Sequence, residues 1–587
     1  MKRNGAEMIV ESLRREGVDI VFGYPGGAVI PIFDALYHSR DIRVILARHE
    51  QAAVHAADGY ARATGKVGVC VATSGPGATN TVTGLATARL DSVPLICITG
   101  QVARHLIGND VFQEADTVGI TQPVTKHNYL VMSREELGTT LKRSFYIAGS
   151  GRPGPVVIDI PKDVLLESRD DEYPDSVELR GYKPAGRASA ESLAELAAAI
   201  GAAQKPLFFI GGGVVMADAS GALNKIIEAT KIPAVTSLMG IGALDSAHPL
   251  NLGMLGMHGA VGANKALCAC DLLVGLGARF DDRAVGDPAR FAPRAKIAHV
   301  DIDPTSIGRT MRADIQVVGD LRTVLDDLAE RIGPQPDRAA WLEETAGFAE
   351  YGESVVEAAE ARKPKVLPTP MQVMKAINAI IPEALIVTEV GQNQMWAAQY
   401  LRIEKPRRWL TSGGLGTMGY GFPAALGAQA AKPRDTVVVV AGDGSFQMNI
   451  QELATSVQEE LPVIVVILNN GYLGMVRQWQ ELFFDKRYSA VCLDRHGGCP
   501  ADCSAPKPGC SAHSPDFAAI AAAYGAAGYR ASTLRELEET LTAALETRRA
   551  CRRPSVIDCR IGREENVWPI VPPGKGNDHM LYEGVLV

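Results

Sequence analysis

Short runs of apolar residues, each ending in a polar or glycine-rich corner, recur along the 587-residue chain. Residues 436–441 end at a Gly-Asp-Gly-Ser corner that contains Asp443, and residues 461–468 end at an Asn-Asn-Gly corner that contains Asn470. Such runs are typical of buried parallel strands, and residues 446–460 between them have helical spacing. A right-handed crossover would place both strands close together in one sheet, with Asp443 and Asn470 at its carboxyl edge. The apolar side of the intervening helix is predicted to include Met448, Leu453 and Val457.

The same alternation organises the N-terminal part of the chain. Four short apolar runs, at residues 18–23, 44–47, 67–73 and 94–99, are predicted strands, and an Ala-rich helix spans residues 51–64. Glu50 stands where the second strand passes into this helix. Strands that alternate with helices predict a doubly wound parallel sheet.

Two further alternating regions follow, so the predicted fold class is α/β, with three doubly wound parallel-sheet domains. In the central region, three apolar runs end in Gly-Gly-Gly, Gly-Ala-Arg-Phe and Asp-Ile-Asp-Pro corners, which suit a nucleotide but are weak evidence alone. Charged, Pro-containing segments separate the regions and are predicted linkers. The predicted limits are an N-terminal domain at 1–165, a linker at 166–190, a central domain at 191–335, a linker at 336–368, and a C-terminal domain at 369–587.

Composition is that of an ordinary globular protein, with 47% apolar and 21% charged residues. A net charge of −8 without a basic tract argues against a nucleic-acid partner. No apolar run reaches the roughly 20 residues that span a bilayer, which argues against a membrane protein. The first seven residues lack the apolar core of a signal peptide, so we expect a cytoplasmic enzyme.

The chemistry of the C-terminal corners favours a metal and an anion. Asp443 offers a carboxylate oxygen and Asn470 an amide oxygen, which are suitable ligands for Mg²⁺ or Ca²⁺. The glycines let backbone approach a ligand, and the helix that follows presents free N–H groups to an anion. A tight turn would explain Gly-Asp-Gly alone, but Asn470 follows Asp443 by 27 positions. This spacing resembles that of thiamine-diphosphate enzymes.

Glu50 is the candidate proton relay for such a cofactor. A lone Glu at a helix start usually does no more than interact favourably with the helix dipole. The aminopyrimidine ring of thiamine diphosphate, however, needs a hydrogen-bond donor at N1′ to reach its imino tautomer. A carboxyl group held in a dry site supplies one.

Taken together, the motifs resemble the catalytic (large) subunit of acetolactate synthase, also called acetohydroxyacid synthase. The resemblance runs nearly end to end. It rests on Arg-His-Glu-Gln at 48–51, His-Ala-Ala-Asp-Gly-Tyr-Ala-Arg at 55–62, Phe-Gln-Glu-Ala-Asp at 112–116, Arg-Pro-Gly-Pro-Val at 152–156, Gly-Ala-Arg-Phe-Asp-Asp-Arg at 277–283, Gly-Met-Val-Arg-Gln-Trp-Gln at 474–480 and Asn-Val-Trp-Pro at 566–569.

The resemblance implies three cofactors: thiamine diphosphate, Mg²⁺ and FAD, the last without a net redox role. Glu50 would contact N1′, the Gly416 carbonyl would accept from the 4′-amino group, and Met418 would hold the cofactor bent. Metal ligands would be Asp443, Asn470 and the carbonyl of Tyr472. Further thiamine-diphosphate contacts would be Pro25, Gly27, Thr73, Pro76, Asn80, Val390, Gly391, Gln392, Asn393, Gly444, Ser445, Leu473, Gly474, Met475 and Val476. FAD contacts would be Arg152, Gly212, Gly213, Leu238, Met257, His258, Gly277, Arg279, Asp281, Arg283, Asp301, Ile302 and Asp320.

The implied reaction is decarboxylation of pyruvate followed by condensation with a second pyruvate or with 2-oxobutanoate, in branched-chain amino acid biosynthesis. The substrate would meet Gly27, Phe112, Gln113 and Lys162, and Trp479 would favour 2-oxobutanoate. The resemblance implies a homodimer, or a dimer of dimers, in which Glu50 and the diphosphate cradle of one site come from different subunits. It also implies a separate small regulatory subunit.

One segment departs from the family pattern. At about 490–514 an insert carries Cys492, Cys499, Cys503 and Cys510, with His496 and His513. A Zn²⁺ ion or an iron–sulfur cluster would suit four cysteines, but the tight C-x-x-C pairs of common metal sites are missing. A free-thiol loop and local disulfides are the alternatives.

Rival functions are distinguishable on the sequence or by assay. Glyoxylate carboligase lacks the carboxylate at the Glu50 position, and an FAD-free catabolic acetolactate synthase should lack the run at 279–283. A pyruvate oxidase would show oxygen- or quinone-dependent turnover. A non-catalytic nucleotide-binding scaffold would be expected to have lost Glu50 or Asp443, and both are present.

Overall fold

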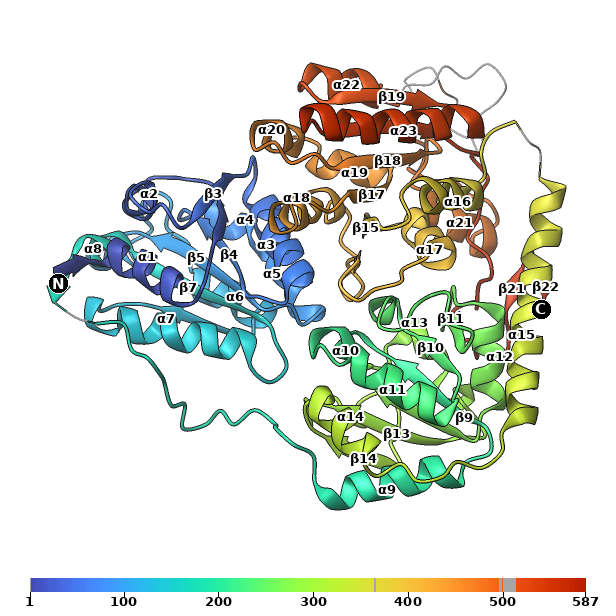
Figure 1. The fold of residues 1–587 in the computed structure, drawn as a ribbon. Coiled ribbons are helices and arrows are strands. Elements are labelled where there is room, and N and C mark those ends of the chain that lie inside the picture. Colours follow the sequence, from blue (N-terminus) through green and yellow to red (C-terminus); the bar gives the residue numbers. More distant parts are fainter. Residues whose placement is uncertain (1, 171, 364–365, 496–498, 500–513) are drawn as a thin grey trace.

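The computed structural model describes residues 2–587 except 171, 364–365, 496–498 and 500–513. The described chain contains three six-stranded sheets, and every strand pairing within them is parallel. Helices cover both faces of each sheet, so the predicted α/β fold with three doubly wound sheets is confirmed. Figure 1 shows the N-terminal sheet in blue at the left, the central one in green below, and the C-terminal one in orange and red above.

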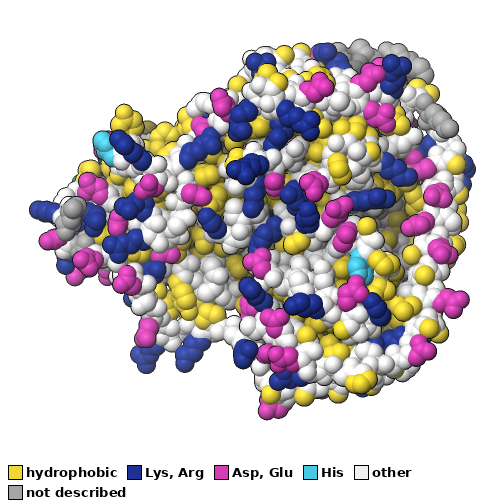
Figure 2. All heavy atoms as spheres, viewed as in Figure 1, with side chains coloured by type: hydrophobic (Ala, Val, Ile, Leu, Met, Phe, Trp, Pro, Cys, Tyr) yellow, Lys and Arg dark blue, Asp and Glu magenta, His cyan; other side chains and the backbone are white. Residues whose placement is uncertain are grey.

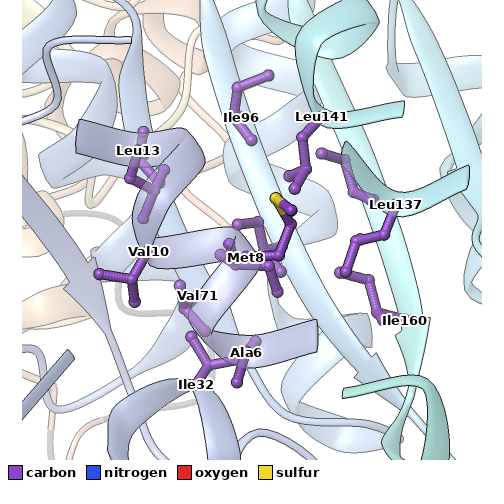
Figure 3. Close-up of a cluster of buried hydrophobic side chains, with 14 of the residues drawn as sticks. Ala6, Met8, Val10, Leu13, Ile32, Val71, Ile96, Leu137, Leu141 and Ile160 are labelled. Atoms are coloured by element: carbon purple, nitrogen blue, oxygen red, sulfur yellow. The ribbon is translucent and has the colours of Figure 1, made fainter. Parts of the chain in front are cut away.

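The N-terminal sheet has the strand order β3-β2-β4-β5-β7-β6. One of its faces packs on α1 and α7, where Met8, Leu13, Leu137 and Leu141 meet Ile96 of the sheet (Figure 3). Helix α1 starts cleanly because the Asn4 side chain accepts from Glu7 N–H in a capping box. The elements are β2 (Ile20–Gly23), β3 (Arg43–Leu46), β4 (Gly68–Ala72), β5 (Leu95–Gln101), β6 (His127–Leu130), β7 (Pro155–Pro161), α1 (Gly5–Arg15), α2 (Ile30–Tyr37), α3 (Glu50–Thr64), α5 (Val82–Leu90), α7 (Arg134–Gly149) and α8 (Lys162–Leu166).

The central sheet has the order β11-β10-β9-β12-β13-β14, so the chain changes direction beside β9. A crevice is expected outside the carboxyl ends of β9 and β12, where successive connections leave in opposite directions. The elements are β9 (Pro206–Ile210), β10 (Ala234–Thr236), β11 (Asn251–Met254), β12 (Leu272–Leu276), β13 (Lys296–Asp301), β14 (Ile315–Val318), α9 (Ala190–Ala202), α10 (Gly212–Met216), α11 (Ser220–Thr230), α12 (Val261–Ala269), α13 (Asp282–Val285) and α14 (Leu321–Ala329).

The C-terminal sheet has the order β16-β15-β17-β18-β20-β19, with its switch between β15 and β17. Strands β17 and β18 are direct neighbours, paired from Val438↔Ile464 to Gly442↔Leu468, as the crossover argument predicts. The elements are β15 (Leu385–Thr388), β16 (Trp409–Leu410), β17 (Val437–Gly442), β18 (Ile464–Asn469), β19 (Ala527–Ala531), β20 (Ser555–Arg560), α16 (Pro370–Ile380), α17 (Gln392–Tyr400), α18 (Gly421–Ala431), α19 (Asp443–Phe446), α20 (Glu452–Gln458), α21 (Gly474–Phe483), α22 (Phe517–Ala523) and α23 (Leu534–Cys551).

The predicted helix at 446–460 is wrong in one respect. It consists of the short α19, a 3₁₀ turn at Gln447–Asn449 and then α20, so its residues do not follow one helical face. Met448, predicted on the apolar side, is 54% exposed, and Phe446 is buried in its place. This break changes the direction of the chain between the Asp443 and Asn470 corners. A pattern with one continuous helical period does not predict such a break.

The N- and C-terminal domains meet where α3 packs against α18. The backbones approach so closely that a Cβ on Gly59 would lie 2.0 Å from the Ala424 carbonyl oxygen. A Cβ on Gly427 would lie 1.8 Å from the Ala56 carbonyl oxygen. Small residues are therefore required on both helices at this contact, and α18 follows the glycine-rich loop that precedes it (Figure 1).

Two long connections complete the described chain. Residues 172–189 carry no helix or strand and lead to the central domain, and the helix α15 (Ala339–Arg362) leads away from it (Figure 1). On the face drawn in Figure 2, basic and acidic side chains are interspersed. None of the helices in the described ranges combines the length and apolar character needed to cross a membrane.

Candidate active site

The two C-terminal corners converge on one small cavity. Asp443 opens α19 after β17, and Asn470 directly follows β18, so the strand pairing brings them to the same sheet edge. Asp443 Oδ2 accepts from Gly471 N–H at 3.0 Å, and Asn470 Oδ1 accepts from Tyr472 N–H at 2.9 Å. Both side chains line a cavity of about 70 Å³. Burial raises the pKa of Asp443 to about 7, and a bound cation would favour its charged form.

The lining of this cavity suits a diphosphate with its metal. Helix α21 begins at Gly474, and the N–H groups of its first turn have no partner within the helix. Gln392 packs directly on Gly474, since a Cβ there would lie 2.0 Å from Gln392 Oε1 and would displace that side chain. Residues predicted to bind the cofactor that line the cavity are Val390, Gly391, Gln392, Asn393, Met418, Asp443, Gly444, Ser445, Asn470, Tyr472, Leu473, Gly474, Met475 and Val476.

The glycine-rich loop at 411–421 borders both this cavity and a larger one. Gly416, with φ +69°, lines the larger cavity, and Met418 lines the smaller. The end of the loop is held by Glu389, whose carboxylate accepts from Gly419 N–H at 2.8 Å and from Phe422 N–H at 3.1 Å. Burial raises the pKa of Glu389 to about 7. Glu389 directly follows the buried strand β15, and no sequence pattern points to this role.

The larger cavity, of about 1060 Å³, lies where the three domains meet. Its size exceeds the range of roughly 300–1,000 Å³ usual for small-molecule sites, so it can hold a dinucleotide. The strand ends of β9 and β12 meet there, and a Cβ on Gly213 would lie 2.8 Å from Gly277 Cα. All of the predicted FAD residues line it: Arg152, Gly212, Gly213, Leu238, Met257, His258, Gly277, Arg279, Asp281, Arg283, Asp301, Ile302 and Asp320.

The chain's C-terminal segment braces one wall of this cavity. The His258 Nδ1 atom lies 3.1 Å from the Pro569 carbonyl oxygen, and Val571 N–H donates to the Met257 carbonyl. Burial lowers the pKa of His258 to about 4, so the imidazole is neutral and donates from Nδ1. This bracing has no counterpart in the sequence patterns, because no spacing rule relates residues about 300 positions apart.

Arg283 and Trp479 stand together in the lining of the same cavity. The Arg283 guanidinium lies 5.7 Å from the centre of the Trp479 ring, in a cation–π contact. Val476, Gln480 and Phe484 of the α21 region also line it. Trp479, predicted to select the second substrate, therefore lies in the same cavity as the predicted FAD residues and Gly416.

The N-terminal group of predicted residues gathers at the carboxyl edge of the first sheet. Glu50 opens α3 and accepts from Asn80 Nδ2 at 3.0 Å. A Cβ on Gly77, next to Pro76, would lie 3.4 Å from Glu50 Oε1. Thr73 Oγ1 accepts from Ala28 N–H at 3.3 Å, beside Pro25 and Gly27. The structure thus brings the predicted pyrimidine contacts into one cluster.

Of the remaining predicted substrate residues, Gln113 borders this cluster. Gln113 adopts a φ of +60° and contacts Gly75, where a Cβ would lie 2.9 Å from Gln113 Cα. Phe112 is 87% exposed, and Lys162 is exposed at the start of α8.

Among the described residues, the N-terminal group lines neither of these two cavities. The described lining of neither cavity includes Glu50, Asn80, Gln113 or Lys162. Pro25, Gly27 and Pro76 are exposed at the edge of the first sheet. The residues predicted to bind thiamine diphosphate therefore lie in two groups, one on each terminal domain, and we call each group a half-site.

The cysteine-rich insert lies largely outside the described residues, which exclude Cys503, Cys510, His496 and His513. Cys492 and Cys499 are the two insert cysteines within the described residues, and Cys492 is a free thiol there. Cys492 pairs with Tyr472 in an isolated antiparallel bridge, so the insert begins beside the Asp443 corner. Within the described ranges no group of three or more His, Cys, Asp or Glu side chains could hold a metal ion.

Comparison with protein-family models places all three sheets in one family. Residues 3–120 match the N-terminal TPP-binding domain of thiamine pyrophosphate enzymes, and residues 193–328 match their central domain. Residues 389–559 match the C-terminal TPP-binding domain. Each half-site therefore belongs to a domain of a kind that binds thiamine pyrophosphate.

The chain is also similar to curated proteins over almost its whole length. It is 47% identical over 584 residues to the acetolactate synthase of Mycobacterium bovis, covering 98% of this chain and 91% of that protein. It is 45% identical over 587 residues to acetolactate synthase isozyme 3 large subunit of Escherichia coli, covering 98% of both. Identity to the Haemophilus influenzae large subunit is 43% over 588 residues, covering 99% of this chain and 98% of that protein. The chain therefore belongs to the acetolactate synthase large-subunit family of thiamine pyrophosphate enzymes.

Proposed function

We propose that this chain is the catalytic subunit of an acetolactate synthase that works in branched-chain amino acid biosynthesis. It would decarboxylate pyruvate and join the remaining two-carbon unit to a second pyruvate or to 2-oxobutanoate. The observation that carries the proposal is the pairing of an Asp443–Asn470 corner with a Glu50–Asn80 cluster, each on a TPP-binding domain.

Bound thiamine diphosphate supplies a carbon nucleophile and an electron sink for the loss of CO₂. We propose that Asp443, Asn470 and the Tyr472 carbonyl hold Mg²⁺, because this donor set is made of hard oxygens at one buried edge. The first turn of α21 and the glycines of the small cavity would bind the diphosphate.

Glu50 is proposed to hold a proton at N1′ of the aminopyrimidine. Its hydrogen bond from Asn80 fixes one carboxyl oxygen and leaves the other directed to a partner. The Gly416 carbonyl would accept from the 4′-amino group, and Met418 would pack between the two rings. Gln113 and Lys162 would orient the substrate carboxylate, and Phe112 would help to exclude water from the site.

The large cavity is proposed to hold FAD. Its volume, its close glycine contacts and its Arg and Asp side chains suit a dinucleotide, and every predicted FAD residue lines it. The visible absorption spectrum of the purified protein tests this assignment. A flavin spectrum that oxygen and pyruvate leave unchanged supports a structural flavin, whereas pyruvate-dependent oxygen consumption would identify an oxidase.

We propose that the working unit is at least a homodimer, in which the Glu50 half-site of one chain closes over the Asp443 half-site of another. Both edges carry exposed apolar side chains that a partner would cover. On the N-terminal domain these are Tyr24, Ile30 and Phe112, and on the C-terminal domain they are Leu415, Met448 and Val476. A small regulatory subunit is proposed only from the family relationship.

Mixing two inactive variants tests the shared site. Glu50→Gln and Asp443→Asn are each expected to be inactive as homodimers. After subunit exchange at equal amounts, half of the dimers contain one chain of each kind, and each of these has one unaltered site. About a quarter of wild-type activity should return. If each site were built within one chain, mixing would restore nothing.

The reaction itself is tested by product identification. The protein is incubated with pyruvate, thiamine diphosphate, Mg²⁺ and FAD, with and without 2-oxobutanoate, and the products are identified by mass spectrometry. We expect acetolactate in the first case and added acetohydroxybutanoate in the second. Acetaldehyde or acetate as the main product would contradict the proposal.

A further inference from the structure

Glu452, a carboxylate of the C-terminal domain, reaches into the N-terminal domain beside Glu50. It opens α20 and is 1% exposed. Its two oxygens lie 2.9 and 3.2 Å from Arg48 N, which donates to them, and Thr455 Oγ1 donates to Oε2 at 2.7 Å. Arg48 precedes Glu50 by two residues, at the point where the chain enters α3. Glu452 therefore fixes the backbone immediately before the proposed proton relay.

Asp91 makes the reciprocal contact, from the N-terminal domain to the glycine-rich loop of the C-terminal domain. It follows α5, and its residue is 4% exposed. Asp91 Oδ2 accepts from Gly413 N–H at 3.1 Å, and Oδ1 accepts from Gly414 N–H at 2.7 Å. These two amides lead directly into Gly416. Asp91 therefore fixes the start of the loop whose end is held by Glu389.

A buried cation balances the Asp91 contact. The Arg62 guanidinium donates to Asp91 Oδ2 at 2.9 Å and to Asp58 Oδ1 at 2.6 Å, and both carboxylates are fully buried. Tyr420, directly before α18, donates to Asp58 Oδ1 at 2.8 Å. A buried carboxylate is stable only when paired or hydrogen-bonded, and bonds from N–H groups to a charged acceptor are the stronger kind. Asp91 and Asp58 are therefore both paired with Arg62 and hydrogen-bonded within one buried polar network.

We infer that Glu452 and Asp91 are reciprocal positioning residues: each domain uses a buried carboxylate to hold the backbone beside the cofactor-contacting element of the other domain. The inference rests on the proposed function, because it takes Glu50 and the Gly416 loop as the elements that contact thiamine diphosphate. Neither carboxylate is itself proposed to touch the cofactor. Both act through main-chain amides two or three residues away.

A purely structural role would be shared by any carboxylate that joins these two domains, and the chain offers such a control. Glu459 Oε2 accepts from Arg43 Nη2 at 2.9 Å across the same domain contact. The Arg43 side chain is 46% exposed, and Glu459 receives no bond from an amide next to Glu50 or the loop. Glu459→Gln therefore removes a cross-domain ion pair and leaves the amide contacts of Glu452 and Asp91 in place.

Amide hydrogen exchange of the cofactor-free protein is the first test. In the wild type we expect the amides of Arg48, Gly413 and Gly414 to be protected. Asp91→Asn should speed exchange at residues 412–416 by about tenfold, because an amide side chain can accept only one of the N–H bonds from Gly413 and Gly414. Glu452→Gln should do the same at residues 46–50, because an NH₂ group replaces one of the two oxygens that accept from Arg48 N–H and Thr455 Oγ1. Unprotected wild-type amides would overturn the inference, even if the variants failed to fold.

The second test measures cofactor binding and turnover. By titration calorimetry, Asp91→Asn should weaken thiamine diphosphate binding about tenfold. Glu452→Gln should lower kcat at saturating cofactor by about tenfold to a hundredfold, as expected for a misplaced reacting group, with little change in KM for pyruvate. Glu459→Gln should match the wild type in both. Variants that match this control would overturn the inference.

The two proposals fail in different ways. A wild-type protein that forms no acetolactate overturns the proposed function, whatever the exchange rates are. Faster exchange in the variants together with unchanged cofactor affinity and kcat overturns the positioning role, whatever the product is.

Discussion

Several buried carboxyl groups have raised pKa values in this fold. Burial raises the pKa values of Asp159, Glu389, Asp443 and Glu452 to about 7 each, because the hydrogen bonds that they accept offset only part of the desolvation. Two of them, Glu389 and Glu452, hold backbone amides near the proposed cofactor contacts. Asp159 differs, since it receives bonds from Thr99 Oγ1 and Gln101 Nε2 within its own domain.

Asp159 gives a pH-dependent prediction for stability. Its pKa is about 7 in the folded chain and about 3.8 when unfolded, so between these values the folded state holds the proton that the unfolded state has lost. Stability therefore falls as pH rises from about 4 to 7. Asp159→Asn removes this dependence, so its free energy of unfolding relative to the wild type should rise by about 3 kcal/mol between pH 5 and pH 8. Urea unfolding at both pH values measures it. A constant difference between the two proteins would show that the raised pKa is wrong.

Glu50 gives the sharpest prediction for catalysis. Glu50→Gln keeps the shape of the side chain and an oxygen for the contact with Asn80, but an amide cannot exchange a proton as a carboxyl group does. Turnover should fall by about 10²- to 10⁴-fold, the usual contribution of a general acid or base. Circular dichroism should show an unchanged fold. A fully active variant would exclude Glu50 as the proton relay.

At the scale of elements, the contact between α3 and α18 decides how the outer domains meet. Gly59 and Gly427 are placed so that any side chain would strike the opposing backbone. Such a contact cannot relax by moving a flexible side chain, so the helices themselves would have to separate.

Gly427→Ala should therefore destabilise the protein by about 1–3 kcal/mol, the usual cost of overpacking, although Ala is the better helix former. Gly201 in α9 is the matched control, because a Cβ there would meet nothing within 4 Å. Gly201→Ala should be neutral or stabilise by up to about 1 kcal/mol. Denaturant unfolding of both variants makes the comparison. Equal effects at the two sites would contradict the close approach.

Much at this scale could be predicted from the sequence. Apolar β-branched runs predicted the strands before Asp443 and Asn470, because buried parallel strands are continuous apolar segments that end at turns. The helix through Met448 was placed on the wrong face, since a 3₁₀ turn interrupts its period. The partners of Glu452 and Asp91 could not be predicted, because no local pattern encodes which distant amide a buried carboxylate will meet. Resemblance supplied the residue roles, and the structure groups those residues in space.

At the scale of the whole molecule, one chain holds its two groups of predicted thiamine-diphosphate residues apart. The small cavity at Asp443 and the large cavity adjoin within a chain through Val390, Gly391, Met475 and Val476, which line both. The Glu50 cluster stands apart on the first sheet. If two chains complete each site, cofactor binding and subunit association must be linked.

Thiamine diphosphate with Mg²⁺ should therefore strengthen the dimer. At about 100 times its dissociation constant, the cofactor should lower the dimer dissociation constant by about 100-fold for each site that it fills. Analytical ultracentrifugation of a dilution series, with and without cofactor, measures this shift. Asp443→Asn removes one proposed Mg²⁺ ligand, so the cofactor should change the dimer dissociation constant of this variant only slightly. Equal association with and without cofactor would mean that each site lies within a single chain.

The tight fit of α3 against α18 has a consequence for chimeric enzymes. An N-terminal domain borrowed from a relative would bring its own α3, whose bulk and polar contacts were matched to another α18. Exchanging the first 165 residues alone should thus produce misassembled hybrids. Moving residues 411–459 along with them would transplant α18, Glu452 and Glu459 together with their N-terminal partners, and so would exchange the domain contact as one unit.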